Sequence, residues 1–300
     1  VRGDVSVPGE RPGADGLSVA VTGAAFGVGA AAVRLLVNEQ AVARVLAIDA
    51  AEPAAELPPD SCAAVELVAA DVTDPALVRL LTGYDVVVHT ALDQSAGGDP
   101  AGRTRSNVRG AQTVLTAAAA AGVRRVVLLS SAMVYGAHED NAVPLDEAAP
   151  LRATPDGSVV GDLLEIEALA ERARHAYAGL SVTVVRPAVL VGPGMDTVLT
   201  RHFESPRLLV LRGSTPRWQF CHVDDAASAC VAAATGQVDG AVTAAAEGWL
   251  SQDEVEALSG RGRLELPAGM AYGTAERLHR LGLTPAPASE LHFLAHPWVV

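Results

Sequence analysis

The fold of this chain is decided by the stretch Val19-Ala20-Val21-Thr22-Gly23-Ala24-Ala25-Phe26-Gly27-Val28-Gly29. An apolar strand here runs into a glycine-rich turn, and an alanine-rich helix follows. Such a turn binds a dinucleotide pyrophosphate because the free N–H groups and the dipole at the helix N-terminus attract anions. Gly23 suits the tight turn, Gly27 the close approach of phosphate, and Gly29 the packing of the helix on the strand. Since glycine-rich turns without a ligand are common, the prediction depends on context.

The next predicted strand supplies that context. Residues 44–48 are mainly apolar and end at Asp49, which stands 20 positions after Gly29. In dinucleotide sites an acidic residue at this spacing accepts hydrogen bonds from the adenosine ribose hydroxyls. Ala50 and Ala51 follow, and no Arg or Lys stands beside them to neutralise a 2′-phosphate. The cofactor is therefore expected to be NADH or NADPH, and Asp49 favours NAD(H).

Composition excludes several classes of function. The 300 residues carry a formal net charge of −13, which argues against a nucleic-acid partner, and no long apolar run predicts a membrane span. We expect a globular cytoplasmic protein. Cys62, Cys221 and Cys230 lack the spacing of metal ligands, so we expect reduced, mostly buried thiols and no metal site. All 22 basic residues are arginines, so the chain offers no catalytic lysine.

Apolar stretches and helical patterns alternate along the first 194 residues. Further buried strands are predicted at 64–69, 85–91, 125–129 and 181–186. This alternation predicts an α/β fold, a Rossmann doubly wound parallel sheet of six or seven strands, with a small C-terminal substrate lobe. We divide the chain into a disordered arm (1–16), a dinucleotide-binding Rossmann domain (17–194) and a part that is mainly substrate-binding lobe (195–300), from which 218–235 returns to the Rossmann core.

Candidate cofactor residues lie at strand ends, because ligands of open α/β sheets bind at the carboxyl ends of the strands. Asp71 is a candidate contact for the adenine amino group, but Asp71 or Asp74 could instead cap the short helix that follows. His89 is expected to be a packed histidine rather than a catalyst. The cofactor candidates are Gly23, Phe26, Gly27, Val28, Gly29, Asp49, Asp71, Val72, Thr90, Ala91, Asn107, Pro187, Ala188 and Val189.

Candidate substrate residues follow the strand at 125–129 and continue into the lobe. Ser131 could orient a carbonyl or merely finish its strand, and Tyr135 is a weaker candidate for a surrogate acid. His222 faces the expected lobe, although a role bonded to the backbone is as plausible. Aromatic lobe residues either line an apolar pocket or form a small satellite core. The substrate candidates are Ser131, Tyr135, Met195, Phe203, Trp218 and His222, with Phe220 as a further pocket candidate.

Taken together, the motifs resemble extended short-chain dehydrogenases/reductases, the NAD-dependent epimerase/dehydratase type, over about residues 17–235. The glycine spacing departs from extended members, which usually carry glycine where this chain has Phe26. The motifs, in chain order, are Thr22-Gly23…Gly27…Gly29, Asp71-Val72, His89-Thr90-Ala91, Ser130-Ser131…Val134-Tyr135-Gly136, Arg186-Pro187-Ala188…Gly192-Pro193-Gly194 and Phe220-Cys221-His222-Val223-Asp224-Asp225.

The resemblance implies a catalytic Tyr and Lys four residues apart on the helix after the serine strand. Aligning Glu167 with the acidic residue usual in that helix puts Val159 at the Tyr position and Leu163 at the Lys position. A shift of one residue gives Val160 and Leu164 instead. The pair is absent in either alignment, and the chain has no lysine at all.

A reductase without this pair is energetically feasible, since a general acid contributes typically ~10²–10⁴-fold. A lysine-free chain without the pair is similar to ketoreductases that act on angucyclinone antibiotics. That resemblance implies NAD(P)H-dependent reduction of a carbonyl of an aromatic polyketide intermediate, with Ser131 orienting the carbonyl and a substrate phenol supplying the proton. Two alternatives stay open: a non-catalytic NAD(P)-sensing module and, ranked last, a nucleotide-sugar epimerase or dehydratase. The oligomeric state is left open.

Overall fold

A seven-stranded parallel sheet forms the centre of the molecule. The computed structural model describes residues 16–51, 62–94, 99–236, 238–281 and 288–300, so nearly all of the predicted arm (1–16) lies outside the described residues. The strand order is β11-β6-β5-β4-β1-β2-β3, which steps outward in both directions from β1 and confirms the predicted doubly wound Rossmann fold. The strands are β1 (Leu17–Thr22), β2 (Val42–Asp49), β3 (Ala64–Ala69), β4 (Val86–His89), β5 (Arg125–Leu129), β6 (Ser181–Pro187) and β11 (Gly240–Ala244).

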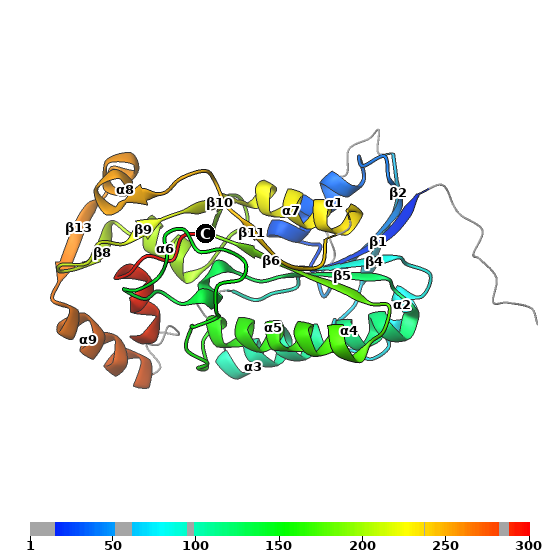
Figure 1. The fold of residues 1–300 in the computed structure, drawn as a ribbon, viewed down its shortest axis with the longest axis horizontal. Coiled ribbons are helices and arrows are strands. Elements are labelled where there is room, and N and C mark those ends of the chain that lie inside the picture. Colours follow the sequence, from blue (N-terminus) through cyan, green and yellow to red (C-terminus); the bar gives the residue numbers. More distant parts are fainter. Residues whose placement is uncertain (1–15, 52–61, 95–98, 237, 282–287) are drawn as a thin grey trace, which may run out of the picture.

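Helices cover both faces of this sheet (Figure 1). On one face α1 and α7 pack together and close a core of small apolar side chains with β1, β4 and β5. On the other face α2, α4 and α5 close a second core. Many alanines let these helices lie close to the strands. The helices are α1 (Gly27–Leu36), α2 (Leu77–Leu81), α3 (Pro100–Thr104), the π-helical turn η1 (Arg105–Arg109), α4 (Gly110–Ala121), α5 (Val159–Ala176) and α7 (Val223–Thr235).

The remaining elements form a lobe beyond the carboxyl ends of the strands (Figure 1). Its core is built around Trp218, Phe293 and Trp298, all buried. Strands β8 and β13 pair in parallel, β7 and β10 likewise, and β9 and β12 pair antiparallel. The elements are η2 (Ala132–Tyr135), β7 (Val189–Val191), α6 (Val198–Glu204), β8 (Arg207–Leu211), β9 (Arg217–Trp218), β10 (Phe220–His222), β12 (Leu250–Ser251), α8 (Gln252–Ser259), β13 (Gly262–Leu266), α9 (Ala268–Arg280) and η3 (Ala288–Leu294).

The return of the chain from the lobe to the sheet is longer than the predicted segment 218–235. Helix α7 packs on α1 as expected, but β11 then pairs with β6 as the seventh strand. Residues 240–244 are short and only half-buried, so their sequence carries no strong strand signal. The cysteines are mostly buried, as expected: Cys221 and Cys230 are buried and Cys62 is exposed.

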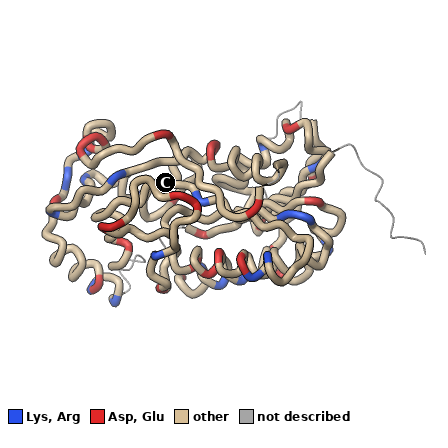
Figure 2. Tube along the Cα trace, viewed as in Figure 1, with Lys and Arg blue, Asp and Glu red and all other residues tan. Residues whose placement is uncertain are grey.

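Charged residues are interspersed over the surface. Figure 2 shows acidic and basic positions following one another along α5. Among the described residues, no helix combines the length and apolarity that crossing a membrane requires.

A buried ion pair joins α5 to the sheet. Arg186, in β6, donates from Nε to Glu167 Oε1 at 2.9 Å and from Nη2 to Glu167 Oε2 at 2.5 Å. Ser130, which follows β5, donates its hydroxyl to Glu167 Oε1 at 2.7 Å. Arg186 Nη1 also donates to the Tyr135 hydroxyl at 2.8 Å. One carboxylate therefore fixes β5, β6 and η2 relative to α5.

We expect Arg186→Met to lower the free energy of unfolding by about 3–5 kcal/mol, because it leaves the Glu167 carboxylate buried without its cation. The control Arg172→Met, on the helix α5 that carries Glu167, removes an exposed ion pair to Glu165. It should change the free energy of unfolding by less than about 1 kcal/mol. Urea denaturation at pH 7 measures both. Equal effects of the two substitutions would contradict a structural role for the buried pair.

Candidate functional site

The turn between β1 and α1 is packed so closely that only glycine fits at two positions. Gly23 has φ +79°, and a Cβ there would lie 2.4 Å from the Ala91 nitrogen. A Cβ on Gly29 would lie 1.9 Å from the Gly23 carbonyl oxygen. These distances are far below van der Waals contact, so both residues allow α1 to begin directly against the ends of β1 and β4. The sequence assigned these two glycines the same roles.

The third glycine of the turn faces the lobe. Gly27, the first residue of α1, has φ +52°, and a Cβ there would lie 3.2 Å from Met195 Sδ. A Cβ on Gly194 would lie 3.2 Å from the Gly27 nitrogen. The predicted phosphate turn and the Gly-Pro-Gly segment therefore lie side by side. Phe26, where extended family members carry glycine, has 66% of its surface exposed at the start of α1.

An open groove of about 290 Å³ runs along the ends of β1 to β4. Asp49 lies at its edge, where its carboxylate accepts the N–H of Ala25 at 3.0 Å and that of Ala51 at 3.1 Å. The carboxylate thus also orders the turn. The predicted cofactor residues that line the groove are Gly23, Phe26, Asp49, Asp71, Val72, Thr90 and Ala91.

Both aspartates after β3 accept a backbone hydrogen bond from two residues on, and α2 itself has no side-chain cap. Asp71 lines the groove, and its Oδ1 accepts the N–H of Thr73 at 2.7 Å. Asp74 accepts the N–H of Ala76 at 2.8 Å, just before α2. Asp71 therefore lines the groove and also orders the turn at Thr73, while Asp74 orders the turn just before α2.

Two further predicted residues lie deeper. Asn107 is fully buried, and its amide nitrogen donates to the Asp93 carbonyl at 3.0 Å and to Asp162 Oδ2 at 3.1 Å. It therefore ties η1 to α5 rather than facing the groove. His89, at the end of β4, is buried with Nδ1 2.7 Å from the Thr22 hydroxyl, and burial lowers its pKa to about 4. His89 is a packed neutral imidazole at pH 7, as predicted.

A second hollow opens at the ends of β5 and β6. Ser131 lines it, and its Oγ accepts the Met133 N–H at 3.2 Å. Val159 lines it too, so the position that the resemblance assigned to Tyr faces the same hollow as the serine. Leu163, at the Lys position, is fully buried. The lining residues are Gln94, Ser131, Met133, Val159, Val160, Ala188, Val189, Leu190, Thr197, Val198, Leu199, Glu290 and Trp298.

Several predicted substrate residues lie outside this hollow. Tyr135 is fully buried and its hydroxyl is held by Arg186, so a role as surrogate acid or substrate contact does not agree with its placement. Trp218 is buried and donates its indole N–H to Gln252 at 2.9 Å. Phe203 packs edge-on against both Trp218 and Phe220. These rings form the satellite core that was the alternative to a pocket.

The other two lobe candidates lie at the margins. Met195 touches the phosphate turn beside Gly27. The side chain of His222 caps α7, where Nδ1 accepts the Asp224 N–H at 3.3 Å, and it lies against Gly192. His222 is therefore bonded to the backbone and does not line the hollow of Ser131.

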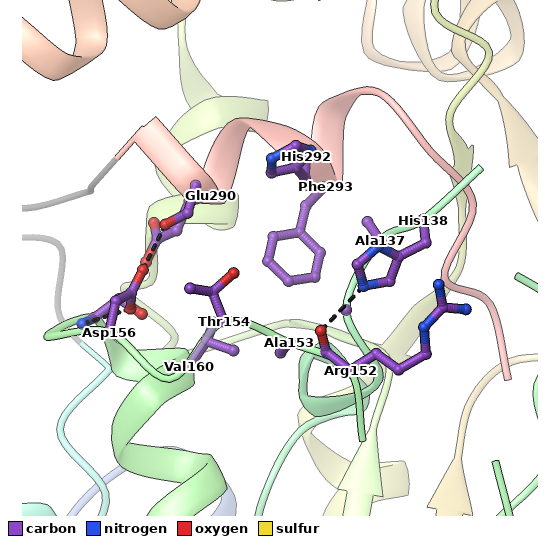
Figure 3. A pocket seen from close by; sticks show the side chains of 13 residues that line it. Ala137, His138, Arg152, Ala153, Thr154, Asp156, Val160, Glu290, His292 and Phe293 are labelled. Carbon is purple, nitrogen blue, oxygen red and sulfur yellow. Dashed lines mark hydrogen bonds between the residues drawn. The ribbon is translucent and has the colours of Figure 1, made fainter. Parts of the chain in front are cut away.

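Sequence reasoning missed a carboxyl group. Glu290, on η3, lines both this hollow and a smaller neighbouring one that Figure 3 shows with His138, Asp156 and His292. Burial, and next the Asp156 carboxylate, raise the pKa of Glu290 to about 7, against a smaller lowering by Arg103. No motif surrounds Glu290, so no sequence signal pointed to it.

Comparisons with known proteins find a matching family model and several relatives. The model of the "NAD dependent epimerase/dehydratase family" matches residues 19–244. An uncharacterised protein of Mycobacterium tuberculosis is 31% identical over 268 residues, which cover 87% of this chain and 70% of that protein. A dTDP-glucose 4,6-dehydratase of Streptomyces griseus is 35% identical over 187 residues, covering 58% of this chain and 54% of that protein.

Solved structures share the fold. WbmH of Bordetella bronchiseptica, in complex with NAD+, has a TM-score of 0.66 at 23% identity and covers 93% of this chain and 96% of its own. MoeE5, in complex with UDP-glucuronic acid and NAD, has a TM-score of 0.65 at 25% identity, covering 83% of this chain and 85% of its own.

We expect His89 to weaken the fold in acid. Because its pKa is lowered from 6.5 to about 4, the unfolded state takes up a proton first as pH falls, and stability present above pH 6.5 is lost toward pH 4. When pH falls from 7 to 5, this one group should lower the free energy of unfolding by about 2 kcal/mol. Urea denaturation at pH 7 and pH 5 should show that the free energy of unfolding of His89→Gln falls by about 2 kcal/mol less than that of the parent protein. The exposed control His175→Gln should lose as much as the parent protein, and a His89→Gln loss equal to the control's would refute the assignment.

Proposed function

The chain belongs to the NAD-dependent epimerase/dehydratase family. We propose that it is an NAD(H)-dependent ketoreductase that works without the family's Tyr and Lys. The substrate we propose is a carbonyl of an aromatic polyketide, of the angucyclinone type that serves as an antibiotic intermediate. The site for this chemistry is the hollow that Ser131 and Val159 share.

The residues of the β1–α1 turn fit a dinucleotide. The close packing at Gly23 and Gly29 brings backbone N–H groups to the edge of the sheet, where a pyrophosphate would be held by the first turn of α1. The Asp49 carboxylate, at the edge of the groove, would accept from the adenosine ribose. Ala188 and Val189 would hold the nicotinamide end, since they line the hollow of Ser131. The bound dinucleotide supplies the hydride.

The observation that carries the substrate class is the apolar lining of that hollow. Valine, leucine, methionine and tryptophan side chains make up most of it, and Val159 replaces the hydroxyl that family members place there. Such a lining favours a flat hydrophobic ring system over a sugar, whose hydroxyls would lose hydrogen bonds to water without replacement. Ser131 can donate its hydroxyl to the substrate carbonyl and so orient it.

Nucleotide-sugar chemistry is the second candidate, since the Streptomyces griseus relative is a dTDP-glucose 4,6-dehydratase. Epimerases and dehydratases move protons on and off the sugar repeatedly, which the missing Tyr and Lys make difficult. A purely NAD-sensing module is the third candidate.

We expect absorbance of reduced nicotinamide to decay when the purified protein is mixed with NADH and an angucyclinone ketone. A panel of UDP- and dTDP-sugars with NAD+, analysed for converted sugar, serves as the comparison. Sugar conversion without ketone-dependent decay would favour the second candidate. Cofactor binding in calorimetry without any turnover would favour the sensor.

We expect Asp49→Asn to weaken NADH binding about tenfold or more, because a hydrogen bond to a charged acceptor is worth about 1.5–3 kcal/mol. NADPH binding should change less, because its 2′-phosphate is repelled by the parent carboxylate. Asp74→Asn is the matched control, since Asp74 orders the turn just before α2 and does not line the groove. Calorimetric titration measures all three proteins, and equal losses for NADH and NADPH in Asp49→Asn would contradict the ribose role.

A further inference from the structure

Glu290 is distinguished by what surrounds it. Among the described residues that line the hollow of Ser131 and Val159, Glu290 is the one ionisable side chain. It also lines the adjoining smaller hollow, so it lies where the two meet. A lobe residue that carries a carboxyl group thus lines the apolar hollow, whereas the residues at the Tyr and Lys positions are on α5.

Neighbouring contacts hold Glu290 in place. Ser289 donates its hydroxyl to Asp156 Oδ2 at 2.5 Å, which fastens η3 to the segment before α5. On the other side of Glu290, Phe293 and Leu294 are buried in the core of the lobe. The carboxyl is therefore carried by a short helix that is anchored at both ends.

We propose that Glu290 is the general acid of this site and delivers the proton that the family's tyrosine would otherwise supply. This inference rests on the proposed ketone reduction. The carbonyl carbon gains the hydride with its electron pair, the C=O π electrons move to the oxygen, and that oxygen takes the proton of the Glu290 carboxyl. The ketone is thereby reduced to an alcohol and the nicotinamide oxidised, and the Glu290 carboxylate regains its proton from water.

The charges around Glu290 suit this task. Burial and the Asp156 carboxylate disfavour its ionisation, which raises its pKa to about 7. Arg103 opposes this shift, but it is engaged by Asp162 Oδ2, 3.0 Å from its Nε, and by the Gly157 carbonyl. A carboxyl with a pKa near the working pH is protonated in a large fraction of molecules and can be reprotonated after each turnover.

Other titratable groups face the same place. His138 and His292 line the smaller hollow with Glu290, and burial, followed by the charges of His296 and His138, lowers the pKa of His292. The His292 imidazole is therefore expected to be largely neutral above pH 7, so it adds little positive charge in the range where Glu290 titrates. The Arg152 guanidinium also lines this hollow, and it donates to Asp140 Oδ1 at 2.8 Å.

The first test is turnover of an angucyclinone ketone with NADH across pH 5 to 9. In the parent protein kcat should fall as pH rises through about 7, because the acid loses its proton. Glu290→Gln should lower kcat ~10²-fold or more with little change in KM, and should remove this pH dependence. Glu290→Asp should keep part of the rate and of the pH dependence. The exposed control Glu247→Gln should behave as the parent.

The second test uses the protein without cofactor. Because the pKa of Glu290 is raised from 4.5 to about 7, its protonated form stabilises the fold fully below pH 4.5. This stabilisation is lost as pH rises through about 7, so the charged Glu290 weakens the fold at high pH. We therefore expect the Tm of Glu290→Gln minus that of the parent to be about 5 °C larger at pH 9 than at pH 5. Glu247→Gln should show no such difference.

The outcomes separate the two proposals. Full turnover by Glu290→Gln with the parent's pH profile would overturn the general acid while leaving the ketoreductase intact, and would point to the substrate phenol as proton source. No turnover of any ketone by the parent would overturn both. A Tm difference that does not vary with pH would refute the titration on which the acid role depends.

Discussion

The buried ion pair between Glu167 and Arg186 sets the geometry on which the candidate site depends. Both side chains lie inside the protein, where two charges are tolerated only when they satisfy each other fully. Ser130 completes the pair, and its neighbour Ser131 is thereby held at the end of β5. Val159 lies two turns before Glu167 on α5, so the same carboxylate fixes both walls of the hollow.

This network also explains why Tyr135 is not available for chemistry. Its ring lies beneath the Arg186 guanidinium at 5.0 Å and its hydroxyl accepts from the same group, so it is a member of the support rather than of the hollow. Burial raises its pKa, and the hydrogen bond from Arg186 offsets part of that rise. A tyrosine held in this way stays protonated at neutral pH and turned away from a ligand.

Local sequence could predict those parts of the site that short-range geometry fixes. Gly23, Gly29 and Asp49 lie within one β-turn-α-β unit, where spacing alone decides which backbone atoms meet. Ser131 could be proposed because it lies just after a buried strand, with Ser130 between it and β5. Strand β11 was not predicted, because its five half-buried residues show no alternation of apolar and polar side chains. Its place beside β6 is decided by tertiary pairing. The family model matches the part of the chain that carries the ordered motifs. The residues of the lobe after it carry no motif from which a site could be predicted.

Glu290 could not be predicted for a different reason: its significance depends on a hollow whose other lining residues, except Trp298, lie far before it in the sequence. The packing also shows why the family's pair of Tyr and Lys is not simply restored on α5. Leu163 is fully buried, so the lysine that accompanies the tyrosine would have to be desolvated there, and the carboxylates nearby on the helix are already bonded. A proton donor carried by the lobe avoids that cost. It also means that the groups proposed to hold the dinucleotide and the proposed acid belong to different parts of the fold, joined near the site through Ser289 and Asp156. Reduction would then require the lobe and the sheet to keep one fixed relative position, which makes the contacts of η3 as important to the chemistry as the hollow itself.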